Sequence, residues 1–202
     1  MRALWILVAV ALQTTPLPPA YPRPGTVSLL DNDRVSVWNI TWLKQTYPLH
    51  RHRYDLVGVY YTSGDRTIVS TEGARRPVTT KAWEIAFQKK GVTHIEEGAS
   101  DVPLKAVFAE LKEDAPRNDA EPATPDSFPR GAAKQVADNE RATVWEFVPP
   151  LPAASPAHRH RTDAVVVSFT GGMPSATFVK KGTSHQGEGA PGAERAYVYE
   201  LK

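Results

Sequence analysis

The chain has 202 residues, enough for one large domain or two small ones. A formal net charge of +2 does not suggest a polyanionic partner such as nucleic acid, and the absence of cysteine excludes disulfide bonds, thiolate metal ligands and a cysteine nucleophile. The 18 prolines and 13 glycines, with an apolar fraction of 41%, predict a packed core of short strands and turns rather than long helices.

Residues 1–20 have the pattern of an export signal. One arginine near the start is followed by an unbroken apolar run over 3–12 and a polar, proline-rich exit. The apolar run is shorter than the roughly 20 residues that a membrane-spanning helix needs. We therefore expect an exported protein, periplasmic or secreted, with no membrane span after signal removal. A membrane anchor or an N-terminal strand is the alternative, and the cleavage position stays open.

The rest of the chain contains one unit in two copies. The pattern D-N-x-R-x-x-V-W occurs at 31–38 and at 138–145, in segments that alternate apolar and polar residues as strands do. Two further strings, HRHR and KKG, follow in the same order in both copies, and each copy ends on a matching strand that closes with E-L-K. This repetition predicts two structural units of similar design.

The predicted units are 26–113 and 134–202. The segment 114–133 between them is rich in proline, aspartate, alanine and glutamate without an apolar period, which is typical of a linker. The first unit has room for a hairpin at 65–86, whereas the second has only 173–177 at the same place. We therefore expect the second unit to lack about one hairpin.

All six histidines lie in the HRHR strings or three residues after a KKG string, and they form two candidate triads: His50, His52 and His94, and His158, His160 and His185. Side chains at i and i+2 of a strand share a face, so the two histidines of each HRHR string can converge on one ion. Three neutral imidazoles leave further positions on a metal open, which is typical of a catalytic rather than a structural site. The alternative is that the histidines are surface or core residues without a metal.

The order of these motifs resembles the cupin superfamily. The HxH string is followed on short strands by glycine and then by G-x-x-H at 91–94, although Lys89 stands where the family usually has proline. The segment 31–112 is most similar to small single-domain cupins with an HRH-x-x-D motif. Because the resemblance covers both copies, it implies a bicupin: an all-β chain of two tandem double-stranded β-helix barrels, the second trimmed by about one hairpin.

One departure from the family concerns the carboxylate ligand. Many cupins have a glutamate four or five residues after the second histidine, but those positions hold apolar residues in both units: Leu56, Val57, Ala164 and Val165. The resemblance therefore implies three-histidine sites. Asp55 and Asp163 come one residue too early and, by strand alternation, face away from the site.

A glutamate follows the third histidine by three residues in each unit. Glu97 is the candidate general base of the first site, and Glu188 is its counterpart in the second. Either could instead orient a histidine or lie in a solvent-facing turn.

The resemblance implies a metal-dependent protein that acts on a small organic molecule, with the better site in the untrimmed first unit. Three-histidine cupins of known activity are often iron-dependent dioxygenases, which points to dioxygen chemistry; isomerisation and hydrolysis stay open. The ion could be iron, manganese, nickel, copper or zinc, since imidazole suits several of them. The alternatives are a non-catalytic cupin that binds a ligand or metal, and a structural repeat without metal. Cupins commonly pair through edge strands, so a homodimer is also open.

Overall fold

The computed structural model describes residues 16–113, 117, 119–129, 133–148 and 156–202. These residues form strands and turns without a helix, so no membrane-spanning helix occurs among them. The strands of the first unit are β1 (Thr26–Asp31), β2 (Val35–Trp42), β3 (His50–Arg51), β4 (Asp55–Tyr60), β5 (Gly64–Val69), β6 (Arg75–Thr80), β7 (Ile85–Gln88), β8 (Thr93–Gly98) and β9 (Leu104–Leu111). Those of the second unit are β10 (Lys134–Asp138), β11 (Ala142–Phe147), β12 (His158–Arg159), β13 (Ala164–Thr170), β14 (Met173–Val179), β15 (Ser184–His185) and β16 (Arg195–Leu201).

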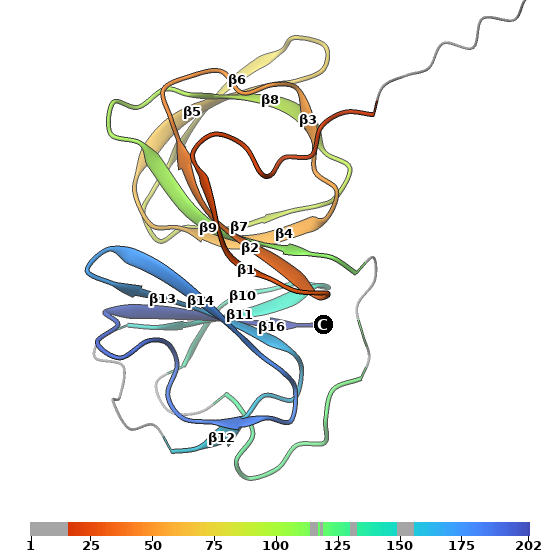
Figure 1. Ribbon diagram of the computed structural model, residues 1–202, viewed down its shortest axis with the longest axis vertical. Helices are drawn as coiled ribbons and strands as arrows, with labels where there is room; N and C mark the ends of the chain where they lie inside the picture. The colour runs from red at the N-terminus through yellow and green to blue at the C-terminus, as the bar shows by residue number, and fades with distance from the viewer. Residues whose placement is uncertain (1–15, 114–116, 118, 130–132, 149–155) are drawn as a thin grey trace, which may run out of the picture.

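Each unit is a barrel made of two antiparallel sheets (Figure 1). The first barrel combines the sheet β1-β2-β9-β4-β7 with the sheet β3-β8-β5-β6. The second repeats the larger sheet as β10-β11-β16-β13-β14, but its smaller sheet is reduced to β12-β15. Strands β5 and β6 have no counterpart among the described residues of the second unit, which confirms the all-β double barrel with one hairpin fewer in the second copy.

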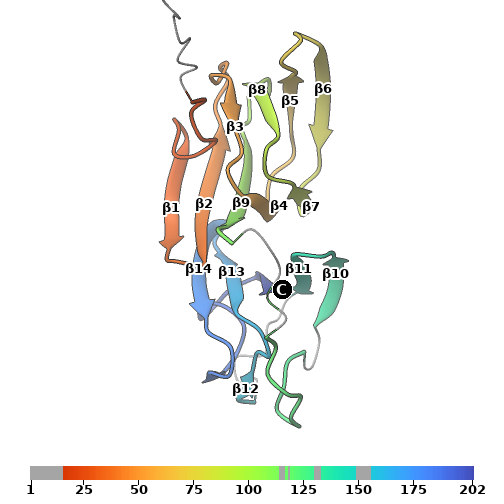
Figure 2. The same ribbon diagram turned by 90° about the vertical axis from the view of Figure 1, so that its right-hand side faces the viewer.

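The two larger sheets pack against each other, so the barrels are stacked through a shared apolar core (Figures 1 and 2). On β4, Leu56 and Tyr60 pack inside the first barrel, whereas Val57 and Val59 pack between the barrels. Both faces of this strand are therefore buried, which explains why it is apolar at nearly every position instead of alternating.

Two reciprocal ion pairs join the barrels. Nε of Arg34 lies 3.3 Å from Oδ2 of Asp163, and Nε of Arg141 lies 3.4 Å from Oδ2 of Asp55. Each aspartate also accepts a hydrogen bond from the backbone of the lysine pair in its own barrel, at Lys90 and Lys181. The repeated arginines and aspartates thus hold the two units together, and the aspartates face away from the histidines as expected.

The proline-rich segment at 16–25 belongs to the first barrel. The carbonyl of Pro18 accepts a hydrogen bond from the backbone N–H of Arg51, and Ala20 and Tyr21 are buried in the barrel core. Residues 1–15 of the predicted signal, 1–20, lie outside the described residues. The last five residues of that prediction, 16–20, are part of this arm.

The end of the predicted linker does the same in the second barrel. The carbonyl of Asp126 accepts from the backbone N–H of Arg159, and Phe128 is buried in that barrel's core. An aromatic residue followed by Pro-Arg thus starts at Tyr21 and again at Phe128. The repeated unit therefore includes an arm that composition alone assigns to a linker.

Candidate metal centres

The first triad lies inside the first barrel, where β3 and β8 pair. His50 is directly opposite His94 in the antiparallel register, and His52 follows β3. The backbone of His52 is held by the KKG turn: its carbonyl accepts from the N–H of Gly91, which has a φ of 85° that favours glycine. One ring nitrogen from each histidine lies within 4.8 Å of the others, and all three side chains are buried. The predicted triad is therefore brought together.

The ring nitrogens of the first triad are arranged as ligands of one ion would be. Nε2 of His52 and Nε2 of His94 are 3.3 Å apart, close to the separation of about 3 Å expected for two imidazoles on a metal with bonds of roughly 2 Å. Nδ1 of His50 lies 2.9 Å from the carbonyl oxygen of Pro48, to which it can donate, leaving the Nε2 lone pair free. That buried Nε2 has no hydrogen-bond partner among the described residues.

Burial keeps the first triad neutral. It lowers the pKa of His52 to about 3, with further lowering by His94 and His50, and it lowers the pKa of His94 to about 4. Burial also lowers the pKa of His50. At neutral pH each of the three imidazoles therefore has one unprotonated ring nitrogen that can bind a cation.

A carboxylate that the sequence analysis did not single out lies beside the first triad. Glu96 is two residues after His94 on β8 and is buried on the same face. Arg23 of the arm lies 2.6 Å from it, and Arg66 of β5 lies 3.7 Å from it. Burial alone would raise the pKa of Glu96, but these two arginines lower it to about 2.

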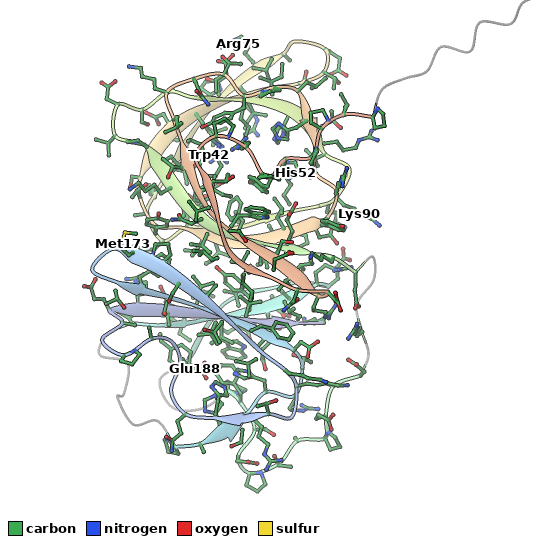
Figure 3. The ribbon with its side chains drawn as sticks, in the orientation of Figure 1. Trp42, His52, Arg75, Lys90, Met173 and Glu188 are labelled. Atoms are coloured by element: carbon green, nitrogen blue, oxygen red, sulfur yellow. The ribbon has the colours of Figure 1, made fainter. Side chains whose placement is uncertain are left out.

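The structure does not bring Glu97 to the first triad. Glu97 lies one residue further along the regular strand β8, on the opposite face, where its carboxylate forms a two-point hydrogen bond with the exposed guanidinium of Arg75. Figure 3 shows Arg75 at the outer surface of the barrel and His52 inside it. A general base role for Glu97 therefore has no support in this geometry, because the side chain engages a surface arginine.

The second triad is assembled in the same way and has an additional donor. His158 is paired with His185 across β12 and β15, and the KKG turn holds His160 through Gly182. Glu188 joins the three histidines, with one potential ligand atom from each of the four residues within 4.8 Å of the others. Oε1 of Glu188 is 2.5 Å from Nε2 of His158 and 3.7 Å from Nε2 of His160.

Glu188 reaches the triad because β15 is short. In the first unit β8 continues regularly past the third histidine, so the residue three positions later faces outward. In the second unit the strand ends at His185, and Gly187 has a φ of 66° that redirects the chain. Glu188 is consequently buried inside the barrel, as Figure 3 shows. The two glutamates occupy equivalent positions in sequence and opposite positions in space.

The charges of the second site differ from those of the first. Burial alone would lower the pKa of His160, but the carboxylates of Glu188 and Glu200 raise it. Burial would raise the pKa of Glu188, whereas His158 and His160 lower it. Nε2 of each histidine and both carboxylate oxygens of Glu188 are buried, and Oε1 of Glu188 approaches Nε2 of His158 to 2.5 Å. Such a cluster of buried donor atoms that face one another fits a cation.

The arm of each barrel places one aromatic ring against its triad. The ring of Tyr21 meets that of His52 edge to face with centroids 6.2 Å apart, and the ring of Phe128 lies 4.5 Å from that of His160. Both rings are buried, so each arm shields one side of a triad from water.

Comparison with known proteins gives structural matches. No family model matches the sequence, and no curated protein matches it. A cupin domain from Bordetella pertussis Tohama I is 27% identical over 46% of this chain and 100% of its own, with a TM-score of 0.41. YhaK from Escherichia coli covers 90% of this chain and 89% of its own at 14% identity with a TM-score of 0.53. AerE from Microcystis aeruginosa covers 89% and 98% at 9% identity with a TM-score of 0.57.

The last two matches extend over both barrels, and each barrel carries the expected motif order on its inner face. The chain has a bicupin fold. Within this fold, two groups of side chains could hold a metal ion, one in each barrel. The closer likeness to single-domain cupins of the HRH-x-x-D type stays a resemblance of the sequence.

The barrel with the larger number of potential metal ligands is not the one that the sequence predicts. Trimming led us to expect the better site in the first unit, but the trimmed second barrel has the fourth donor, Glu188. The first triad has instead a neighbouring cavity of about 260 Å³, lined by His52, His94 and Glu96 among others. The signal for Glu96 was present in the sequence, since a polar residue two positions after His94 shares its face.

Proposed function

We propose that the protein is an exported metal-binding bicupin that acts on a small organic molecule at the triad of the first barrel, His50, His52 and His94. The observation that supports this proposal is the convergence of three buried, neutral imidazoles at the edge of a cavity. A divalent ion held there would supply Lewis-acid or redox chemistry. Three protein ligands leave room on such an ion for a small molecule, which four ligands would restrict.

The chain's own groups would shape the reaction. Tyr21 packs against His52 and also lines the cavity, which would admit a substrate beside the triad. Glu96 is held as a carboxylate by Arg23 and Arg66, so it does not serve as a proton acceptor at neutral pH. Dioxygenase activity is the first reaction to test, because the three-histidine ligand set suggests it.

A second candidate function is non-catalytic ligand or metal binding, and the second barrel favours it. Its four donors are gathered on buried side chains, with Phe128 packed against His160. Such a site suits retention of an ion more than turnover. We therefore propose that the second barrel, at His158, His160, His185 and Glu188, binds its ion without catalysis.

Turnover separates the two candidates. The purified protein, loaded with iron, manganese, nickel, copper or zinc in turn, is supplied with a panel of small carbonyl and phenolic compounds, and oxygen consumption and product formation are followed. We expect turnover that is abolished by His52→Ala and retained by His160→Ala. No turnover with any metal would contradict the enzyme proposal and favour the binding protein.

A further inference from the structure

The cavity beside the first triad carries an excess of positive charge. Arg66 and Arg76 line it, and Glu96 is the acidic residue of its wall. Glu96 is already paired at 2.6 Å with Arg23, whose guanidinium lies outside the cavity lining. Arg66 is further from Glu96, at 3.7 Å, so the charge of this arginine is only partly compensated.

Arg66 is held rigidly and has donors to spare. Its guanidinium lies 4.9 Å from the ring centre of Tyr60 and 5.3 Å from that of Trp42, and one nitrogen donates to Thr80 at 3.3 Å. Its side chain is only 13% exposed, and its buried Nε lies 3.7 Å from Oε1 of Glu96, too far for a hydrogen bond. A buried cation with unsatisfied donors is costly unless an anion joins it, and the planar guanidinium matches a carboxylate.

A second unsatisfied donor faces the same space. Gln88 lines the cavity from β7, and its buried Nε2 has no hydrogen-bond partner among the described residues. The corresponding residue of the second barrel is Val179, which packs in that barrel's apolar core. Arg66 and Arg76 lie on the β5–β6 hairpin, for which the described part of the second barrel has no counterpart. The polar groups are therefore a property of the first barrel and not of the repeated scaffold.

We propose that the first barrel binds small molecules bearing a carboxylate, with the carboxylate held by Arg66 and Gln88 and the rest of the molecule directed toward the triad. This inference rests on the proposed function for the role of the triad, but the carboxylate site itself needs no metal. Arg76 attracts the anion at the cavity wall. The cavity volume of about 260 Å³ lies below the range of about 300–1,000 Å³ typical of drug-sized ligands, so the molecule is small.

Calorimetric titration of the full chain, both metal-free and metal-loaded, tests this proposal. The probes are benzoate and propionate, each compared with its neutral amide of the same shape, benzamide and propionamide. We expect both carboxylates to bind the metal-free protein at least tenfold more tightly than their amides. If the protein takes up no metal on loading but still binds the carboxylates, the proposed metal function fails and this inference stands.

Variants locate the binding site. Arg66→Gln should weaken benzoate binding at least tenfold, Arg66→Lys should weaken it less, and Gln88→Val, which installs the residue of the second barrel, should weaken it severalfold. Arg75→Gln removes a neighbouring arginine on the outer face of the barrel and should leave the benzoate affinity unchanged. Thermal unfolding of each variant confirms that it is folded. Equal affinity for benzoate and benzamide, or unchanged benzoate affinity in both Arg66→Lys and Gln88→Val, would overturn the proposal.

Discussion

The carboxylate of Glu188 lies among three imidazoles, and its charge should dominate how the second barrel holds an ion. It is buried, and its Oε1 lies 2.5 Å from Nε2 of His158 and 3.7 Å from Nε2 of His160. A negatively charged ligand strengthens the attraction of a histidine set for any divalent cation. The second barrel should therefore retain its ion more tightly than the first.

Replacing Glu188 with glutamine should weaken metal binding in the second barrel by at least about tenfold, the loss expected even for a residue that only orients a ligand. Competition with a chelator measures the change. Glu97→Gln is the matched control, because this residue occupies the equivalent sequence position but pairs with Arg75. Equal effects of the two substitutions would show that Glu188 does not contact the ion.

Glu110 provides a pH-dependent prediction away from the histidines. Burial raises its pKa, against the opposing effect of the hydrogen bond that it accepts from Trp38. Because the pKa of Glu110 is higher in the folded state than in the unfolded state, protonation favours folding. The free energy of unfolding therefore falls as pH rises from the unfolded-state pKa to the folded-state pKa, and is constant above it. Glutamine at position 110 does not ionise, so Glu110→Gln removes this pH-dependent loss of stability. The melting temperature of the variant, relative to that of the wild type, should therefore be higher at pH 7 than at pH 4. The same difference at both pH values would refute the assignment.

The two-residue spacing predicts that His50 and His52, or His158 and His160, converge, although β3 and β12 end one residue before the second histidine. It does not predict the position of Glu188, because alternation applies only while the strand continues. The end of β15 after His185 and the positive φ of Gly187 are set by the three-dimensional chain path. The pairing of Asp55 with Arg141 of the other barrel likewise depends on how the units stack, which a repeat does not reveal.

At the scale of elements, the β5–β6 hairpin and the arms differ in how well the sequence predicts them. The missing hairpin was predictable from the short interval at 173–177. The arm of the second barrel was not, because a proline-rich segment without an apolar period is typical of a linker, and part of the first arm falls within the predicted export signal. Their function depends on backbone hydrogen bonds to β3 and β12, at Arg51 and Arg159, which composition does not encode.

A chain that starts at Tyr21 should lose protection in β3 compared with a chain that starts at Pro16. The shorter form lacks the carbonyl of Pro18, which accepts from the backbone N–H of Arg51 at 3.0 Å, and it also lacks buried Ala20. A backbone amide that loses its hydrogen-bond acceptor exchanges its hydrogen with solvent more readily. Hydrogen exchange at Arg51 measures this, and equal exchange in the two forms would mean that the arm does not hold β3. The measurement also bears on whether an export signal can end as late as Ala20.

At the scale of the whole molecule, the shared core makes the barrels interdependent. Valines of β4 and β9 pack with valines of β13 and tyrosines of β16 in one cluster, and the reciprocal arginine–aspartate pairs also join the barrels. The larger sheets of the two units thus cover each other. A homodimer, which stays a prediction, would have to use surfaces other than these.

Breaking one buried pair between the barrels should cost far more than breaking an exposed one. Arg141→Met leaves Asp55 without its partner in the second barrel and should destabilise the chain by about 3–5 kcal/mol. The control is Lys89→Met, which removes an exposed pair with Glu140 that also crosses between the barrels and should cost about 0–1 kcal/mol. Chemical denaturation followed by hydrogen exchange in both barrels measures the difference. Similar costs would mean that Arg141 does not couple the units.

Metal content per chain tests most directly whether each barrel holds an ion among its histidines. We expect about two ions in the wild type and about one in either His52→Ala or His160→Ala, with the first barrel losing its ion earlier to a chelator. Fewer than about a tenth of an ion per wild-type chain after loading with each candidate metal, in protein that is fully folded, would contradict the account.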